Sequence, residues 1–167
     1  MEQEGRKVGR FEDGTEAVIG ALIEVHRTLG PGLLESAYEA CVCAEFSLRG
    51  LRFARQRPLA VDYKGLRVDC GYRLDIVVDE RILVELKTVE RLLPIHEAQV
   101  VTYLRLARLP LGLLVNFNVI VLKTALRRLT PHESLPQRRR VREGDRRTGR
   151  SEDRKGWQQQ NPGLLEV

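Results

Sequence analysis

Residues 53–87 constrain the fold more than any other part of the chain, because three segments rich in β-branched and aromatic residues follow one another there. Tight turns at Tyr63-Lys64-Gly65 and Asp79-Glu80-Arg81 separate these segments. Strands joined by such short turns pair antiparallel. Pro58 places the first strand at a sheet edge or at a bulge. The predicted strands of this meander are Phe53–Val61, Leu66–Val78 and Ile82–Lys87.

Helical patterns lie on both sides of the meander. One helix is predicted to begin at Thr15, as its N-cap, and to stop at Gly30-Pro31-Gly32. A second spans about 34–48 and ends before Gly50, and a third spans about 95–107 after Pro94. Residues 111–117 (LGLLVNF) are apolar nearly throughout, as in a strand covered on both faces. Residues 119–129 fit either a short strand or a last helix. This order predicts an α/β domain with a mixed central sheet flanked by helices.

Composition divides the chain into three parts. Residues 1–13 are predicted to be a flexible leader, and 14–130 the folded domain. Residues 131–167 hold nine of the 28 Lys/Arg and six of the 23 Asp/Glu, so this tail supplies +3 of the net charge of +5. The tail is Arg-rich and lacks apolar periodicity, which predicts disorder. It fits a phosphate-binding extension or a merely solvating one equally well.

The chain has the features of a soluble protein. It contains no apolar run near the ~18 residues of a membrane span. The charged N-terminus lacks the apolar stretch of a signal peptide, which predicts a cytoplasmic location. The three cysteines, Cys41, Cys43 and Cys70, are predicted to be buried or inert thiols, because an odd number without a signal peptide argues against a disulfide framework.

Two charged residues interrupt the apolar strand ILVELK. Because side chains alternate along a strand, Glu85 and Lys87 point to the same face. In the preceding strand the same rule puts Asp75 on one face with Arg73 and Val77, and Leu74, Ile76 and Val78 on the other. The turn at residues 79–81 lets Asp75 lie beside Glu85. Adjacent carboxylates repel one another, and a hard divalent cation relieves that repulsion. Such a site, with a lysine beside it, suits metal-assisted phosphodiester hydrolysis.

The spacing of Asp75, Glu85 and Lys87 resembles the PD-(D/E)XK nuclease superfamily, although Leu74 stands where the leading proline of that motif would be. The run Gly32-Leu-Leu-Glu35-Ser-Ala-Tyr38 is similar to the motif of the small bacterial and archaeal GxxExxY proteins. The stretches DCGYRLDIVV, VELKTVERLLPIHEAQVVTYL and GLLVNFN extend this resemblance over about residues 14–129. It implies a restriction-endonuclease-like core.

The resemblance also implies roles for individual residues. Asp75, Glu85 and Glu35 would be ligands of Mg²⁺, with Mn²⁺ as an alternative, and Lys87 the catalytic lysine. Gln99 would complete the catalytic set, because Gln99 and Tyr103 match a Q-x-x-x-Y pattern of the RecB-like branch. The supporting residues would be Tyr38, Tyr103 and His96. The implied partner is nucleic acid, either DNA or RNA. The protein would act on it as an endonuclease or as an exonuclease.

Several alternatives stay open from sequence. The chain is either an active nuclease or a catalytically silent nuclease-fold module that binds nucleic acid or a protein partner. Three of these residues also have a structural interpretation. Glu35 fits a carboxylate that interacts with the positive end of a helix. Tyr38 fits a buried ring with a hydrogen-bonded hydroxyl, and His96 fits a role at a helix N-terminus. His26 is expected to be a satisfied core or interface histidine, whose helix face leaves room for a homodimer. Asn116, in an apolar strand, needs a hydrogen-bond partner inside the fold.

Overall fold

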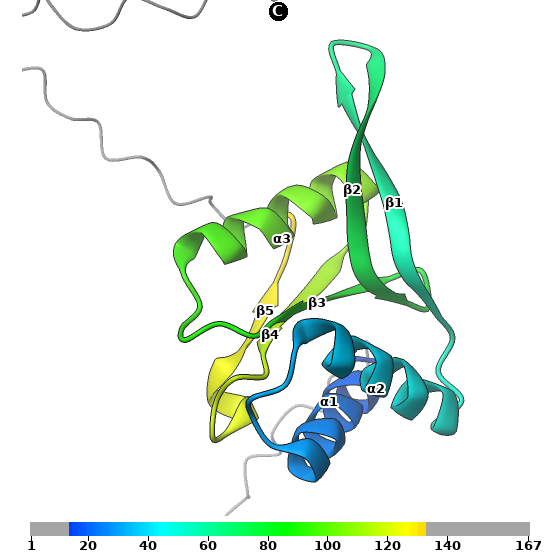
Figure 1. Ribbon diagram of the computed structural model, residues 1–167. Coiled ribbons are helices and arrows are strands. Elements are labelled where there is room, and N and C mark those ends of the chain that lie inside the picture. Colours follow the sequence, from blue (N-terminus) through cyan, green and yellow to red (C-terminus); the bar gives the residue numbers. More distant parts are fainter. Residues whose placement is uncertain (1–13, 133–167) are drawn as a thin grey trace, which may run out of the picture. The chain divides into compact units, whose positions relative to one another are not determined.

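The computed structural model describes residues 14–132, which form a five-stranded mixed sheet with helices on its two faces (Figure 1). The strand order follows the sequence, β1-β2-β3-β4-β5. β1, β2 and β3 pair antiparallel, β4 pairs parallel with β3, and β5 pairs antiparallel with β4. The predicted meander and the edge position of the strand that carries Pro58 are therefore confirmed. The strands are β1 (Phe53–Tyr63), β2 (Leu66–Val78), β3 (Ile82–Lys87), β4 (Leu111–Asn116) and β5 (Leu126–Leu129).

Helices α1 (Thr15–Leu29) and α2 (Glu35–Leu48) cover one face of the sheet, and α3 (Pro94–Ala107) covers the other (Figure 1). Alternate residues of β3 divide between the two resulting cores. Val84 packs in the core under α1 and α2, whereas Leu83 packs in the core under α3. Burial on both faces explains why β4 is apolar almost without interruption, as predicted. Residues 119–129, which fit either a short strand or a helix from sequence, contain a short 3₁₀ helix, Leu122–Ala125, followed directly by β5.

The turns follow local backbone chemistry, with one correction. Gly30 ends α1 at a φ of 66°, as the Gly-Pro-Gly stop predicts. The β2–β3 turn places Asp79 and Glu80 in the left-handed region, with φ of 49° and 54°. The prediction of Thr15 as an N-cap was wrong, because Gly14 occupies that position with a φ of 81°. Thr15 is the first residue of the helix, and its side chain is buried in the protein interior.

Both strands of the β1–β2 hairpin bend at Gln56 and Asp75. The ladder pairs Arg55 with Ile76 and Arg57 with Leu74, but the pair between them is missing. Gln56 has a φ of 51°, a conformation that side chains other than glycine rarely adopt within a strand. As a result Leu74 packs under α3 while Ile76 packs under α1 and α2. The expected shared face of Leu74, Ile76 and Val78 was therefore wrong, because alternation restarts at this bend.

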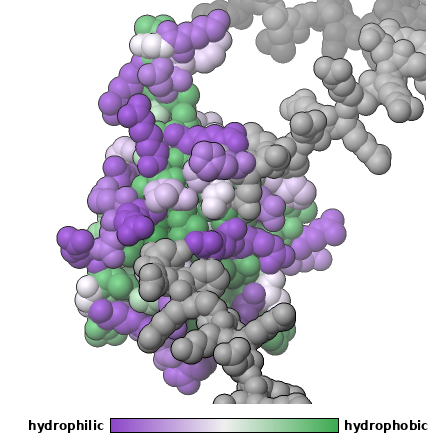
Figure 2. All heavy atoms as spheres, turned by 180° about the vertical axis from the view of Figure 1, so that it is seen from behind, coloured by the Kyte–Doolittle hydropathy of each residue, from purple (hydrophilic) through white to green (hydrophobic). Residues whose placement is uncertain are grey.

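Beyond the bend, the β1–β2 hairpin leaves the sheet. β2 pairs with β3 only over Ile76–Val78, so the rest of its 13 residues pair with β1 alone. Figure 1 shows this two-stranded ribbon projecting past α3, and in Figure 2 hydrophobic atoms reach its tip. We call residues 61–72 the arm. Every residue from 62 to 72 is exposed.

Two further expectations concern the cysteines and the ends of the chain. Cys41 and Cys43 are partly buried on α2 and Cys70 is exposed on the arm; all three are free thiols, so of the two alternatives Cys70 is not a buried one. The described helices include none with the length and apolarity needed to cross a membrane. The predicted leader at residues 1–13, and residues 133–167 of the predicted Arg-rich tail, lie outside the described residues.

Gly112 of β4 should be essential to the packing of α3. A Cβ there would lie 2.6 Å from Val100 Cγ1 and 3.2 Å from Leu104 Cδ1, and both side chains are fully buried. We expect Gly112→Ala to lower the free energy of unfolding by about 1–3 kcal/mol through overpacking, measured by urea denaturation. The control is Gly20→Ala on α1, where a Cβ meets only the flexible end of Arg49 and helix propensity favours alanine. Equal stability of the two variants would contradict the prediction.

Candidate active site

The site begins where β2 separates from β3. The last pair of their ladder is Ile76 with Val84. One residue further, Asp75 turns its side chain across to β3, and its Oδ2 accepts a hydrogen bond of 2.9 Å from the backbone N–H of Leu86. Where the two strands separate, the Asp75 carboxylate therefore accepts the N–H of Leu86 in place of a backbone carbonyl. This contact fixes Asp75 next to Glu85, the residue before Leu86.

Glu85 and Lys87 point to the same side of β3, as their spacing predicts. Lys87 Nζ lies 2.6 Å from Glu85 Oε1, and the Glu85 side chain is only 3% exposed. The other carboxylate oxygen, Glu85 Oε2, is buried and has no hydrogen-bond partner. A buried carboxylate oxygen without a partner lowers the stability of the fold, so this atom has an unused capacity to accept a hydrogen bond or a cation.

Glu35 reaches the same cluster from α2. It is the first residue of that helix, and its carboxylate accepts a hydrogen bond from the backbone of Thr88, directly after β3. The preceding loop is held by Tyr38, whose hydroxyl donates to the carbonyl of Gly30 and accepts from the N–H of Leu33. The Tyr38 ring is fully buried and stacks on Phe117 with centroids 4.5 Å apart. Tyr38 therefore has a buried, bonded hydroxyl and positions Glu35 indirectly.

The electrostatics of the cluster show an excess of negative charge. Burial, then the neighbouring Asp75, raises the pKa of Glu85 to about 7. Burial also raises the pKa of Asp75 and of Glu35 above their ordinary values. Burial opposes the charge on Lys87, but Glu85, Glu35 and Asp75 together raise the pKa of its ammonium. Three carboxylates thus share one cation, which leaves a net charge of about −2 when all are ionised.

These properties fit a small divalent cation. Mg²⁺ prefers oxygen ligands and is commonly held by one or two carboxylates together with water. Asp75 and Glu85 supply such oxygens, and the unpartnered Oε2 of Glu85 is the atom that would gain a partner from a bound cation. Within residues 14–132, no three His, Cys, Asp or Glu side chains form a ready-made metal cage. The fit therefore rests on the two strand carboxylates, with Glu35 close by.

The residues predicted on α3 line a groove beside the arm. The Gln99 amide donates a 3.0 Å hydrogen bond to the hydroxyl of Tyr103, and both residues line a groove between α3 and the arm. His96 also lines this groove, and its Nδ1 accepts from the N–H of Leu93, which is the helix N-terminal role that sequence left open. In the described part of the chain, no hydrogen bond or ion pair joins these three residues to the carboxylate cluster.

Sequence reasoning missed a second layer around the cluster. Glu39, one turn after Glu35, is buried and receives hydrogen bonds from Arg55 Nε at 2.6 Å and from Gln56 Nε2 at 3.0 Å. The Gln56 side chain also hydrogen-bonds the Asp75 carboxylate. This layer ties α2, the bend of β1 and Asp75 together. The four-residue spacing of Glu35 and Glu39 was the one available signal, because it puts both on one helix face.

Two other polar residues have structural tasks. Asn116 at the end of β4 donates to the carbonyl of Val89 at 2.7 Å and accepts from its N–H at 3.1 Å. It has the internal partner that sequence required, and it fixes the chain just after Lys87. His26 Nε2 lies 2.8 Å from the carbonyl of Val119, and the residue is buried. His26 is therefore a satisfied core histidine, and a homodimer through this helix stays a prediction.

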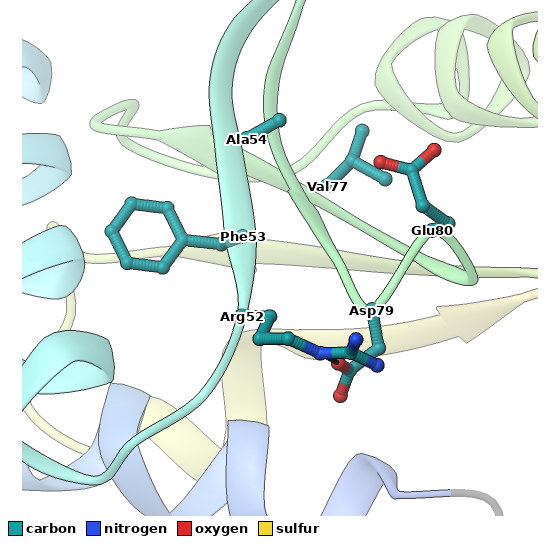
Figure 3. A pocket seen from close by; sticks show the side chains of 6 residues that line it. All are labelled: Arg52, Phe53, Ala54, Val77, Asp79 and Glu80. Atoms are coloured by element: carbon teal, nitrogen blue, oxygen red, sulfur yellow. Dashed lines mark hydrogen bonds and ion pairs between the residues drawn. The ribbon is translucent and has the colours of Figure 1, made fainter.

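A further pocket lies at the C-terminal end of β2, beside the β2–β3 turn (Figure 3). Arg52, Asp79 and Glu80 line it, and Arg52 Nε lies 3.1 Å from Asp79 Oδ1. Its charged groups pair with one another or with neighbouring arginine, as Glu80 does with Arg57. It contains no member of the carboxylate cluster, and its contacts secure the β2–β3 turn.

A comparison with protein-family models matches residues 12–129 to the PD-(D/E)XK nuclease superfamily. The chain belongs to this superfamily. The match confirms the restriction-endonuclease-like fold expected from the sequence, with a mixed sheet between helical layers. Searches of curated proteins and of solved structures gave no significant match to this chain. Nuclease-like proteins of this superfamily typically use divalent metals and act on nucleic acid.

The buried charge of Glu85 should weaken the metal-free protein at neutral pH. Because its pKa is about 7 in the folded state against 4.5 ordinarily, the folded state binds more protons between these values. Stability therefore falls as the pH rises through this window, by roughly 3 kcal/mol from the shift alone. In EDTA we expect Glu85→Gln to lose much of this pH dependence, measured by urea denaturation between pH 4.5 and 8. The exposed Glu90→Gln is the control, and unchanged pH dependence in Glu85→Gln would contradict the assignment.

Proposed function

We propose that this protein is a metal-dependent nuclease that hydrolyses phosphodiester bonds of nucleic acid, with residues 14–130 as its nuclease domain. The observation that carries the proposal is the unpartnered Oε2 of Glu85 within a cluster of three carboxylates and one lysine. Such a cluster costs stability, and a structural role alone does not require it. Asp75 and Glu85 would hold Mg²⁺ or Mn²⁺, with Glu35 as a further ligand.

Each residue of the cluster would have a distinct role in hydrolysis. When bound, the divalent ion would stabilise the negative charge that develops on the phosphate oxygens. Lys87, two residues after Glu85 on β3, would orient the attacking water through its ammonium group. The backbone N–H of Leu86 holds Asp75 in place for its task. Gln99, supported by Tyr103 and near His96, would contact the substrate from α3.

We further infer that the chain is a GxxExxY protein, because each fixed residue of that motif has a definable task. Gly32 has a φ of 106°, which disfavours any residue with a side chain. Glu35 contributes its carboxylate to the cluster, and Tyr38 fixes the loop that leads to it. DNA or RNA would be the partner, and a cytoplasmic location remains a prediction of the sequence.

Cleavage assays test the proposal directly. Purified full-length protein with Mg²⁺ or Mn²⁺ should cut at least one substrate among duplex, single-stranded and branched DNA and RNA. Asp75→Ala and Lys87→Ala should each lower the cleavage rate at least about 100-fold, because each removes a group that acts on the reacting phosphate. Lys123→Ala, an exposed lysine on the 3₁₀ helix, should cleave normally. Absence of cleavage on every substrate, together with no metal binding by calorimetry, would refute the proposal.

A further inference from the structure

Gln56 has a backbone conformation that its residue type does not favour. Its φ of 51° lies in the left-handed region, where glycine is the ordinary residue and asparagine the commonest exception. The β1–β2 ladder is intact on both sides of it, at Arg55 with Ile76 and at Arg57 with Leu74. Strain confined to one residue persists only where contacts enforce it, and it concentrates at functional sites. The contacts of Gln56 therefore indicate a task beyond strand formation.

The side chain of Gln56 joins two carboxylates that come from different elements. Its Nε2 donates to both oxygens of Glu39 on α2, at 3.0 Å each. The same side chain hydrogen-bonds the carboxylate of Asp75 on β2. Glu39 is only 7% exposed, and Arg55 Nε donates to it at 2.6 Å. The amide of Gln56 thus ties Asp75 to a buried anchor on α2.

Asp75 is held from both of its neighbouring strands. From β3, the backbone N–H of Leu86 donates to Asp75 Oδ2 at 2.9 Å. From β1, the partner is the Gln56 side chain, and the Gln56 carbonyl in turn accepts from Arg73 Nη1 at 3.2 Å. Because β2 lies between β1 and β3, these hydrogen bonds fix the direction in which the Asp75 carboxylate points.

Carboxylates that bind metal ions are usually oriented by hydrogen bonds from residues that do not touch the ion, and removing such a partner lowers metal affinity about 10- to 100-fold. We propose that Gln56 is a positioning residue, whose amide orients the Asp75 carboxylate for a divalent cation with Glu39 as its anchor. The inference rests on the function proposed above, in which Asp75 is a ligand of Mg²⁺ or Mn²⁺.

A purely structural role for Gln56 leads to the opposite expectation for a glycine substitution. Glycine reaches a φ of 51° without strain. If the residue served only the bend of the hairpin, glycine would suit the position at least as well as glutamine. Gln56→Gly therefore separates the two roles, because it relieves the backbone strain and removes the amide at the same time.

The first measurement is Mn²⁺ binding to the full-length protein, by calorimetry with manganese chloride. Gln56→Gly should weaken this binding about 10-fold or more, while its melting temperature stays near that of the wild type. Gln56→Asn tolerates the left-handed conformation but is one methylene shorter, so it should also weaken Mn²⁺ binding. It tests the proposal even where the glycine variant fails to fold.

The matched control is Arg108→Gly. Arg108 ends α3 with a φ of 56° and is exposed, so glycine relieves the same kind of strain there. No printed hydrogen bond of the described residues joins Arg108 to Asp75, whose partners are Leu86 and Gln56. Arg108→Gly should therefore keep the Mn²⁺ affinity of the wild type.

Hydrogen exchange of the Leu86 amide in EDTA supplies a measurement without metal. Because Asp75 accepts this N–H, the amide should exchange faster in Gln56→Gly than in the wild type, and at the wild-type rate in Arg108→Gly. A wild-type chain that binds Mn²⁺ no better than Gln56→Gly does overturns this inference and leaves the proposed function intact. A wild-type chain that neither binds Mn²⁺ nor cuts nucleic acid overturns both.

Discussion

The burial of Glu85 beside Asp75 is the interaction on which the rest of the site depends. Two carboxylates at the point where β2 leaves β3 repel each other, and Lys87 satisfies only one oxygen of Glu85. A fold optimised for stability alone would place apolar side chains in such a position. In the function proposed above, a bound cation would offset this repulsion and restore the stability that the buried charge costs.

The bend in the β1–β2 hairpin makes this arrangement possible. Gln56 adopts a strained left-handed conformation opposite Asp75, and its side chain holds both Glu39 and Asp75. The bend frees Asp75 from the regular ladder, so its carboxylate can accept from Leu86 rather than point away along the strand. Strain of this kind persists only where surrounding contacts enforce it, and here Arg55 and Glu39 supply them.

The same bend separates two regions with different chemistry. On the sheet side lie the carboxylates of Asp75, Glu85 and Glu35 together with Lys87. On the far side the hairpin continues as the arm, where Tyr63 pairs with Leu66 and Lys64 Nζ lies 5.4 Å from the centroid of the Tyr63 ring. Gln99 and Tyr103 line the groove, and the Gln99 amide donates to the Tyr103 hydroxyl. A chain of this size thereby offers a polar site and a separate apolar surface on one hairpin.

The sequence by itself determined the elements, their order and the fold family, because turns, hydrophobic period and spaced motifs are local signals. It also put Glu85 and Lys87 on one face of a strand, since alternation needs only the backbone. Only the tertiary structure decided how side chains meet. The left-handed Gln56 resets the alternation of Leu74 and Ile76, Glu39 joins the site from a helix, and Gln99 pairs with Tyr103 instead of with the acids. These outcomes depend on contacts between segments far apart in the chain, which local periodicity does not encode.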